Sequence, residues 1–372
     1  MTTGDTPRQR IVRLTPLNNV HAVVDRCLSP VAVRAAELAD ALGRIVAEDV
    51  RAPGALPVLP SAIRDGWAVN ADLVADAGPY APVLLAPPPC LVEHGDALPA
   101  DCNAVLPPDA VVRTPAGYEA IAPAAPGEGV LPGGFDALAG RLLVHAGARL
   151  RASDIAALRA AGVSRVSVRA PRITIVAARQ GLDAAASFVA AAIAGEGGIA
   201  RCAFCNVGEL SRAIAASDAD AIVTIGGTGQ GGSDRTAETV ASVGELVIHG
   251  VGIRPGDSAG FGAVAGRPIL LLPGRLDAAL AAWLLVGRRM LQRLAGAAEE
   301  DTARPFVLTR KIASGIGLAE IVLVRRVGGG IEPIATGVFS LHALAQASGW
   351  VLVPPESEGY PSGATVDVHP LP

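Results

Sequence analysis

The sequence is poor in charged residues, and it has no block of like charges. Only 18% of its 372 residues are charged, whereas 51% are apolar. A disordered chain needs the opposite balance, so this composition excludes one. The formal net charge is −4. Non-specific binding of nucleic acid needs a basic surface, so we expect no nucleic-acid partner.

Long hydrophobic runs are also missing. The longest apolar stretches, such as Leu276–Val286, are too short to span a bilayer, and Arg288 and Arg289 follow this one. The first ten residues are not followed by the apolar core of a signal peptide. We therefore expect a soluble, cytoplasmic protein with no membrane partner.

The five cysteines do not form a recognisable pattern. Their odd number and irregular spacing argue against a disulfide framework. Cys202 and Cys205 form a lone C-x-x-C motif, and a zinc site would need a second pair of ligands nearby. The six histidines are dispersed, without metal-ligand spacing. We expect the cysteine pair to be structural.

Proline density divides the first half of the chain. Residues 15–50 show apolar positions at three- and four-residue steps, which predicts helix. Prolines are dense over 51–145, where they forbid long helices and favour a small β domain with many turns. Residues 153–162 then look like a capped helix that ends at a glycine. We therefore predict a discontinuous helical or mixed domain, 1–50 with 146–170, interrupted by an inserted β domain, 51–145.

The second half alternates strands with helices and then becomes β-rich. Over 171–297 we predict buried strands at 173–176, 221–225 and 269–272, with helices between them and a long helix over 278–294. This alternation implies a mostly parallel sheet. Residues 298–372 read as a C-terminal β domain. The predicted class is α/β plus β, with several domains.

A glycine-rich loop, G-G-T-G-Q-G-G-S-D at 226–234, follows the predicted strand that ends at Ile225. Ligands of parallel sheets bind beyond the carboxyl ends of the strands, where this loop must lie. It has no lysine, so it is not a Walker A loop. No acidic residue closes a second strand about 20 residues later, which disfavours a dinucleotide fingerprint. Its glycines do let backbone amides approach an anion, and Asp234 adds a carboxylate that suits a bridging cation.

Two further loops are predicted in the same α/β domain. R-P-G-D-S-A-G-F-G occupies 254–262, and L-P-G-R occupies 272–275, where Arg275 opens the long helix. An arginine at a helix N-terminus is a suitable phosphate partner. Each loop alone is an ordinary turn, but three at strand ends form a stronger signal.

These three segments, in this order and spacing, resemble the molybdopterin molybdenumtransferase family (MoeA and the gephyrin E domain). The segment S-A-I-R-D-G-W-A-V at 61–69 is similar to the family's S-A-M-D-G-Y-A-V. The resemblance covers nearly the whole chain. It implies an elongated protomer of four parts with a molybdopterin-binding α/β domain. It also implies a homodimer whose site lies between the α/β domain of one subunit and other domains of its partner.

The resemblance implies a reaction as well. The family takes adenylylated molybdopterin and molybdate, uses a divalent cation such as Mg²⁺, inserts molybdenum and releases AMP in molybdenum cofactor biosynthesis. It implies Asp234 and Asp65 as catalytic residues, with Asp234 also a metal ligand. The residues implied to bind the pterin phosphate are Gly226, Gly227, Thr228, Gly229, Gly231, Ser233, Pro255, Gly256, Pro273, Gly274 and Arg275. A molybdoenzyme or another cofactor-biosynthesis protein would be a partner.

The chain departs from the family's pattern at the expected site. The family's loop serine is Gly229, its lysine after Pro-Gly is Asp257, and its acidic pair is replaced within Ala178–Gly181. An aspartate in place of a lysine removes a phosphate-neutralising charge and adds a repulsive one. Loss of the acidic pair removes expected cation ligands or acid–base groups.

Three hypotheses follow from these departures. The chain is a molybdenum-insertion enzyme with a modified site, a non-catalytic carrier of molybdopterin or finished cofactor, or a scaffold that retains only the fold. An acidic residue that reaches the altered space from elsewhere would favour the enzyme. The sequence offers Asp183, Glu93 and Asp96 for that role.

Overall fold

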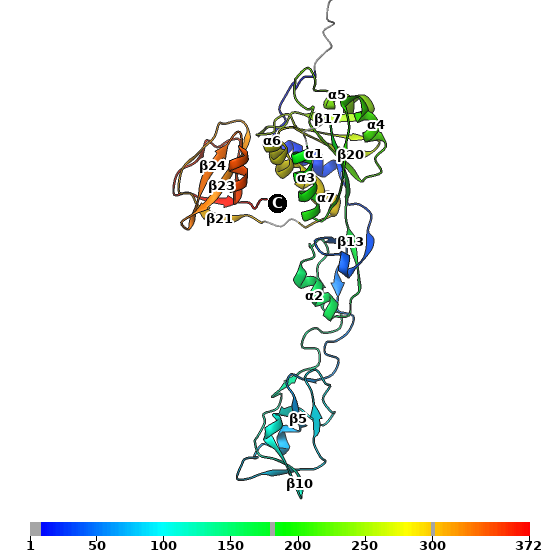
Figure 1. Cartoon of the computed structure of the whole chain (residues 1–372), viewed down its shortest axis with the longest axis vertical. Helices are drawn as coiled ribbons and strands as arrows, with labels where there is room; N and C mark the ends of the chain where they lie inside the picture. The colour runs from blue at the N-terminus through cyan, green and yellow to red at the C-terminus, as the bar shows by residue number, and fades with distance from the viewer. Residues whose placement is uncertain (1–8, 179–182, 299–301) are drawn as a thin grey trace, which may run out of the picture.

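The computed structural model describes residues 9–178, 183–298 and 302–372. The chain is elongated (Figure 1). An α/β part lies at one end of the long axis. A small part that includes α2 (Ala152–Ala160) and β13 (Arg165–Arg169) lies below it, and a β part that includes β5 (Gly66–Val69) and β10 (Gly117–Ala120) forms the far end. The C-terminal β part lies beside the α/β part.

The α/β part contains a six-stranded sheet in the order β15-β14-β16-β20-β19-β17. The first four strands are mutually parallel, while β19 and β17 run antiparallel to their neighbours. The strands are β14 (Arg172–Ala177), β15 (Ile199–Phe204), β16 (Ala221–Ile225), β17 (Glu245–His249), β19 (Gly260–Val264) and β20 (Arg267–Leu272). The predicted strands at 173–176, 221–225 and 269–272 are confirmed. The prediction missed β15, β17 and β19.

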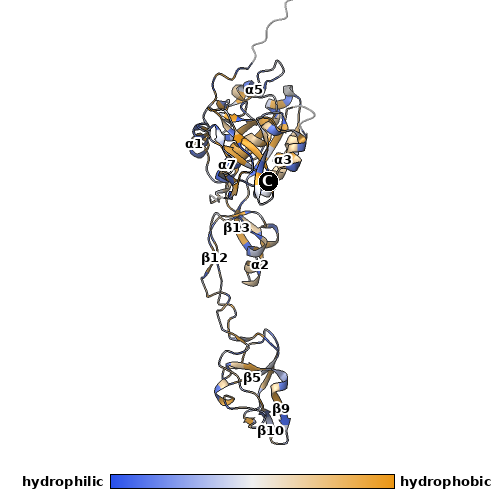
Figure 2. Cartoon of the chain, turned by 90° about the vertical axis from the view of Figure 1, so that its left-hand side faces the viewer, coloured by the Kyte–Doolittle hydropathy of each residue, from blue (hydrophilic) through white to orange (hydrophobic). Residues whose placement is uncertain are grey.

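Helices cover both faces of this sheet, which is why β16 is buried along its whole length. Alternate strand residues face two separate cores: Ile175 and Val223 pack with α1, α3, α6 and α7, whereas Val176 and Ile222 pack with α4 and α5. Figure 2 shows the hydrophobic strands between their flanking helices. The helices are α1 (Leu17–Cys27), α3 (Asp183–Gly195), α4 (Leu210–Ala215), α5 (Thr236–Val243), α6 (Leu276–Ala282) and α7 (Arg288–Ala295).

The long helix predicted over 278–294 is one continuous helical segment, but its middle is a π-helix over Trp283–Gly287 that joins α6 to α7. Trp283 is fully buried. A Cβ at Gly287 would overlap its indole ring, so the glycine makes room for this bulky side chain within the wider turn.

The helix predicted across 31–46 is wrong. Helix α1 ends at Cys27, and the following chain forms β1 (Arg34–Glu37), a 3₁₀ turn (Leu38–Asp40) and β2 (Ile45–Val46). Both strands pair antiparallel with β13 (Arg165–Arg169), which lies more than a hundred residues later, so a partner distant in sequence overrides the local helical spacing. In addition, α1 packs into the core of the α/β part through Leu17, Val20 and Val24. The predicted helix at 153–162 is present as α2 (Ala152–Ala160).

The far β part is reached by two antiparallel strands, β3 (Val50–Arg51) on the way out and β12 (Leu142–Val144) on the way back. It contains two three-stranded sheets, β7-β5-β8 and β6-β10-β9, and a short β4-β11 pair. Its strands are β4 (Ser61–Ala62), β5 (Gly66–Val69), β6 (Val83–Leu85), β7 (Cys90–Val92), β8 (Ala104–Leu106), β9 (Val111–Thr114), β10 (Gly117–Ala120) and β11 (Val130–Leu131).

The C-terminal part is built around the long strand β23, which pairs with β24 and β25 and also with β18. Because β18 belongs to the segment that follows β17, the α/β part contributes a strand to this sheet. The elements are β18 (Ile253–Arg254), β21 (Arg304–Val307), β22 (Ile312–Ala313), β23 (Ala319–Val327), β24 (Gly330–Thr336), α8 (Leu341–Gln346), β25 (Gly349–Val353), β26 (Gly359–Tyr360) and β27 (Thr365–Val368). Within the described ranges no helix has both the length and the apolar character needed to cross a bilayer.

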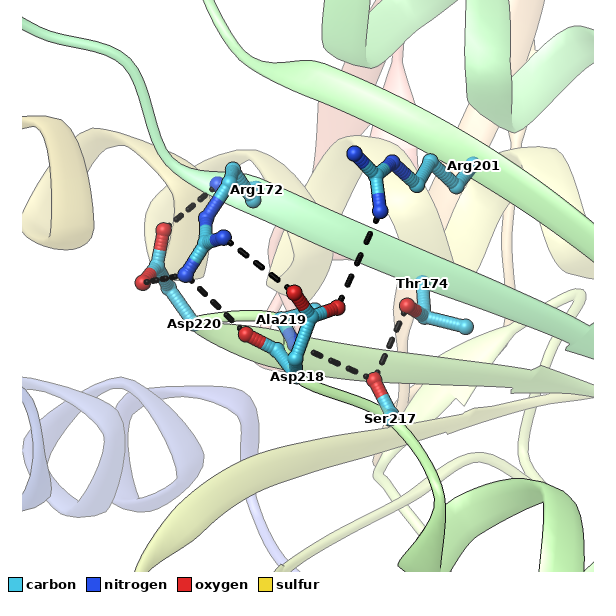
Figure 3. A network of polar contacts seen from close by, with 7 residues as sticks. All are labelled: Arg172, Thr174, Arg201, Ser217, Asp218, Ala219 and Asp220. Carbon is cyan, nitrogen blue, oxygen red and sulfur yellow. Dashed lines mark hydrogen bonds and ion pairs between the residues drawn. The ribbon is translucent and has the colours of Figure 1, made fainter.

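A network of charged side chains lies at the amino edge of the six-stranded sheet (Figure 3). The Arg172 guanidinium lies 3.4 Å from the Asp218 carboxylate and 3.5 Å from the Asp220 carboxylate, and it donates to the carbonyl oxygen of Asp218 (3.0 Å). Arg201 approaches the other oxygen of Asp218 at 3.8 Å. Asp220 also accepts from the backbone amide of Arg172 (2.8 Å). This network ties the turn before β16 to β14 and β15, on the side opposite the glycine-rich loop.

Candidate functional site

Three loops meet at the carboxyl edge of the parallel strands. The glycine loop (residues 226–235) follows β16, and residues 273–275 follow the neighbouring strand β20. The amide of Gly226 donates to the carbonyl oxygen of Leu272 (2.9 Å), which joins the two loops where the strands end. The loop that follows the strand at 221–225 therefore lies at the carboxyl edge of the sheet.

The start of the glycine loop is held against α5. Gly227 has φ +69°, the amide of Thr236 donates to its carbonyl oxygen (2.9 Å), and the Thr236 hydroxyl donates to the carbonyl oxygen of Gly226 (2.6 Å). A Cβ at Gly227 would overlap the Thr236 hydroxyl. Only glycine fits here, because the left-handed backbone and the close approach both oppose a side chain.

Asp234 is half-buried, and its carboxylate turns back onto the loop. It accepts from the amide of Gly231 (3.0 Å), while the amide of Asp234 donates to the carbonyl oxygen of Gly231 (3.0 Å). A Cβ at Gly229 would lie 2.8 Å from Asp234 Oδ2. Glycine at 229 therefore makes room for this carboxylate. The remaining predicted loop residue, Ser233, is exposed.

The second predicted loop contacts the first. The hydroxyls of Thr228 and Ser258 are hydrogen-bonded at 3.0 Å, and Thr228 is fully buried. His249 Nε2 contacts the carbonyl oxygen of Thr228 at 2.8 Å. Because a carbonyl oxygen only accepts, Nε2 is the donor in this bond. Pro255 and Gly256 are buried beside α6, and a Cβ at Gly256 would lie 2.9 Å from the carbonyl oxygen of Ala278.

The third loop, which includes Pro273 and Gly274, ends in a forked ion pair. Arg275 donates through Nε and Nη2 to the Asp277 carboxylate (3.2 and 3.1 Å), which is only 3% exposed. Asp277 also accepts from the amides of Ala278 (2.9 Å) and Phe339 (3.0 Å). Burial alone would raise the pKa of Asp277, but the hydrogen bonds from Arg275 and the two amides outweigh it and lower that pKa. Arg275 is thus bound to Asp277 on one edge, and Asp277 links this loop to the C-terminal part.

The structure does not bring Asp65 to these loops. Asp65 is exposed, lies between β4 and β5 in the far β part, and accepts from the amide of His94 (2.8 Å). Glu93 and Asp96 lie in the same turn, where Asp96 accepts from the amide of Glu93 (2.9 Å). Figure 1 places this turn, near β5, at the opposite end of the chain from α5. Asp183, Glu93 and Asp96 were the acidic residues predicted to be able to replace the missing acidic pair. Of these three, only Asp183, at the start of α3, lies at the carboxyl edge of the sheet.

The three loops of one chain offer few side-chain ligands for a divalent cation. Among the residues that the structure describes, no three His, Cys, Asp or Glu side chains lie close enough together to hold a metal ion. Asp234 is the single predicted carboxylate at the glycine loop, and Asp257 is exposed in the neighbouring one. The replaced residues Arg179, Gln180 and Gly181 lie outside the described residues. The arrangement therefore offers backbone amides and one carboxylate, which suits an anion more than a preformed metal site.

Three residues that support the loops were not predicted from the sequence: Gln9, His249 and Asp277. Gln9 contacts Gly227 across 218 residues of sequence, and His249 contacts Thr228 across 21. His249 and Gln9 stand in segments with no motif of their own. Only Asp277 had a local signal, since an aspartate in the first turn of a helix that follows Arg275 suggests an ion pair.

Comparison with known proteins matches three consecutive stretches of the chain to family descriptions. Residues 14–162 match the "MoeA N-terminal region (domain I and II)", residues 177–293 a "Probable molybdopterin binding domain", and residues 305–371 the "MoeA C-terminal region (domain IV)". Together these matches account for most of the chain in the family's own order.

Full-length relatives agree with these matches. A molybdopterin biosynthesis protein of Methanocaldococcus jannaschii is 28% identical, covering 97% of this chain and 99% of that protein. Molybdopterin molybdenumtransferase 2 of Mycobacterium tuberculosis is 26% identical over 95% of this chain and 98% of its own length. The crystal structure of a molybdopterin biosynthesis MoeA protein from Pyrococcus horikosii superposes with a TM-score of 0.76 at 27% identity, covering 97% of this chain and all of that one. The chain belongs to the MoeA family of molybdenum cofactor biosynthesis proteins.

Proposed function

We propose that this protein is a molybdopterin molybdenumtransferase, which inserts molybdenum from molybdate into adenylylated molybdopterin and releases AMP. The observation that carries the proposal is the meeting of three loops at the carboxyl edge of the sheet, joined through Gly226–Leu272 and Thr228–Ser258. Membership of the MoeA family supports it. So does the name of the M. tuberculosis relative, a molybdenumtransferase.

In this proposal the glycine loop binds the phosphate of the pterin nucleotide through backbone amides. Such amides bind anions without a side-chain charge, which the loop needs because Asp257 replaces a lysine. Arg275 adds a guanidinium at the neighbouring loop, where Pro273 and Gly274 allow close approach. The pterin phosphate is the group that these residues bind, and molybdate is the second substrate.

Magnesium fits this arrangement as an ion that arrives with the nucleotide. Mg²⁺ in proteins is usually held by one or two carboxylates together with substrate phosphates, rather than by an all-protein cage. Asp234 supplies one such carboxylate beside the loop amides. The cation would neutralise phosphate charge.

We further propose that the working form is a cytoplasmic homodimer. Asp65 directly precedes β5 and Asp234 lies two residues before α5, and these two elements lie at opposite ends of the elongated molecule (Figure 1), so a site that uses both residues requires two chains. Asp65 of one subunit, with Glu93 and Asp96 in the same turn, would then face the glycine loop of its partner. We also propose that each subunit has four domains. In this division, residues 51–145 form an inserted Pro-rich domain and residues 298–372 form the C-terminal domain.

The alternative is a carrier that binds molybdopterin or the finished cofactor and passes it to a molybdoenzyme. One observation favours it: Asp257 is exposed in the second loop, where its negative charge opposes a phosphate. A carrier needs affinity but no chemistry, so it tolerates the loss of acid–base groups better than an enzyme does.

AMP release decides between the two functions. Purified protein incubated with adenylylated molybdopterin, molybdate and Mg²⁺ should release AMP, and Asp234→Ala should reduce the rate at least roughly a hundredfold. Asp367→Ala, which removes an exposed carboxylate on β27, should leave the rate unchanged. Tight pterin binding without AMP release would establish the carrier.

The same assay tests the two-chain site. Asp65→Ala and Asp234→Ala should each be inactive alone. Mixed and allowed to exchange subunits, they should recover up to about a quarter of the wild-type rate, because half of the dimers then contain one intact site. No recovery from a mixture that does exchange subunits would contradict a site shared between chains.

A further inference from the structure

The first described residues form a strap that runs alongside residues 250–252, which precede the second loop, and reaches the glycine loop. Thr15 pairs with Val251: its amide donates to the carbonyl oxygen of Gly250 (2.9 Å), and its own carbonyl oxygen accepts from Gly252 (2.7 Å). A Cβ at Gly250 would lie 2.8 Å from the carbonyl oxygen of Arg13, so the strap lies directly against this backbone. We call residues 9–15 the strap.

Gln9, at the end of the strap, is buried against the glycine loop and is 9% exposed. Its Nε2 donates to the carbonyl oxygens of Gly227 (2.8 Å) and Gly229. Its Oε1 accepts from the amides of Ala237 (3.2 Å) and Glu238 (3.4 Å), in the first turn of α5. One carboxamide thus holds both the loop and the helix that follows it.

The acceptor half of Gln9 works as a helix cap supplied from 228 residues away in the sequence. The amide of Thr236 is already bonded to Gly227, so the first three amides of α5 all have partners. They are therefore not available to a phosphate. An anion bound at this loop must use the amides of the loop itself.

The donor half of Gln9 sets the direction of those loop amides. A trans peptide unit is planar, with its C=O and N–H pointing in opposite directions. Holding the carbonyl oxygens of Gly227 and Gly229 toward Gln9 therefore turns the amides of Thr228 and Gln230 away from it. Fixing these peptide units in advance reduces the ordering that ligand binding would otherwise require.

We propose that Gln9 is a positioning residue for the anion-binding loop. It orients the loop amides through its donor half and keeps α5 closed to the ligand through its acceptor half. The inference rests on the proposed function for the identity of the ligand, but its structural part, a loop held in place by Gln9, stands apart from it.

Three variants separate the two halves of the side chain. Gln9→Ala removes both. Gln9→Glu keeps an acceptor for the α5 amides, where a carboxylate is favourable, but it replaces the donor with an oxygen facing two carbonyl oxygens. Gln346→Ala is the matched control, since Gln346 is an exposed glutamine at the end of α8.

The first measurement is backbone hydrogen exchange in the ligand-free protein. We expect exchange at residues 228–233 to be at least about tenfold faster in Gln9→Ala and in Gln9→Glu than in the wild type. Exchange in the first turn of α5 should be faster only in Gln9→Ala. Unchanged exchange at 228–233 in both variants would overturn the inference, whatever the protein binds.

The second measurement is binding of adenylylated molybdopterin. Both variants should bind roughly tenfold more weakly than the wild type. If Gln9→Glu binds as tightly as the wild type, Gln9 is only a helix cap and the positioning role is wrong. If the wild type itself does not bind, the proposed function fails, and hydrogen exchange alone decides the role of Gln9.

Discussion

At the amino edge of the six-stranded sheet charged side chains bind one another, whereas at the carboxyl edge side chains and neighbouring strands hold the backbone of three loops. Arg172 is bound by Asp218 and Asp220 at the first edge (Figure 3). At the second, Gln9 and His249 bind carbonyl oxygens of the glycine loop. The same strands thus end in a charge network on one side and in a shaped backbone on the other.

The difference separates stability from binding. Arg172 and its partners join β14, β15 and the turn before β16, and none of the predicted site residues takes part. The contacts at the carboxyl edge instead fix the orientation of peptide groups that a ligand would use. We therefore expect substitutions at the amino edge to change unfolding alone, and substitutions that displace the loop backbone at the carboxyl edge to change binding as well.

The largest effect should come from Gly227→Ala at the carboxyl edge. The added Cβ overlaps the Thr236 hydroxyl and requires a left-handed backbone, which costs about 1–3 kcal/mol and displaces the loop. Binding of adenylylated molybdopterin, measured by calorimetry, should weaken roughly a hundredfold, or about 2.7 kcal/mol. Gly208→Ala is the control, because nothing lies within 4 Å of its added Cβ. If the two variants bind with equal affinity, the backbone at the carboxyl edge does not control binding, and the proposed difference between the two edges is wrong.

An intermediate effect is expected for Asp277→Asn, and it should depend on pH. The pKa of Asp277 is lowered in the folded protein, so its stabilising contribution is complete above the unfolded-state pKa, about 4, and is lost as the pH falls through the folded-state pKa. The uncharged asparagine side chain would mimic the protonated carboxyl group. At pH 7 the free energy of unfolding should be about 1–3 kcal/mol higher for the wild type than for Asp277→Asn. This difference should become smaller below pH 4.

Urea unfolding at several pH values measures that difference. Asp367→Asn, at an exposed position, serves as the control. A gap between wild type and Asp277→Asn that stays constant from pH 7 to pH 3 would show that the charge of Asp277 is not what stabilises this loop.

The smallest effect should come from Arg172→Ala at the amino edge. It removes the hydrogen bond to Asp218 and both ion pairs, and should lower the free energy of unfolding by about 1–2 kcal/mol without changing pterin affinity. Asp218→Ala should cost less than about 0.5 kcal/mol, because this carboxylate is 73% exposed. A loss of pterin binding in Arg172→Ala would show that the edges are coupled.

Sequence patterns predicted the α/β part best where the signal is local. The runs at 173–176, 221–225 and 269–272 are short, apolar and buried on both faces, and all three are strands. The pattern failed at 31–46, because β1 and β2 take their conformation from β13, far along the chain. The prediction also missed β17, which pairs antiparallel with β19 at the edge of the sheet.

The candidate site shows the same limit. The glycines of the loop could be predicted because close backbone approach requires that residue type. Gln9 could not, because its role depends on a contact 218 residues away, and glutamine has no preferred site of this kind. Asp65 was predicted as part of the site from the family resemblance. The sequence did not show that the β part that contains Asp65 lies far from the glycine loop, because this distance depends on the extended connection formed by β3 and β12.

The strand β18 lies in the α/β segment but pairs with β23 of the C-terminal part, and the amide of Ala319 donates to the carbonyl oxygen of Gly252 (2.9 Å) beside it. Residues 305–372 are therefore not a detachable module. Cutting the chain before them would leave β18 as a bare edge immediately ahead of Pro255 and would remove the Phe339 amide from Asp277. A shortened chain would lose two supports of the loops at once, so deletion of the C-terminal part should impair binding even though none of the predicted site residues lies within it.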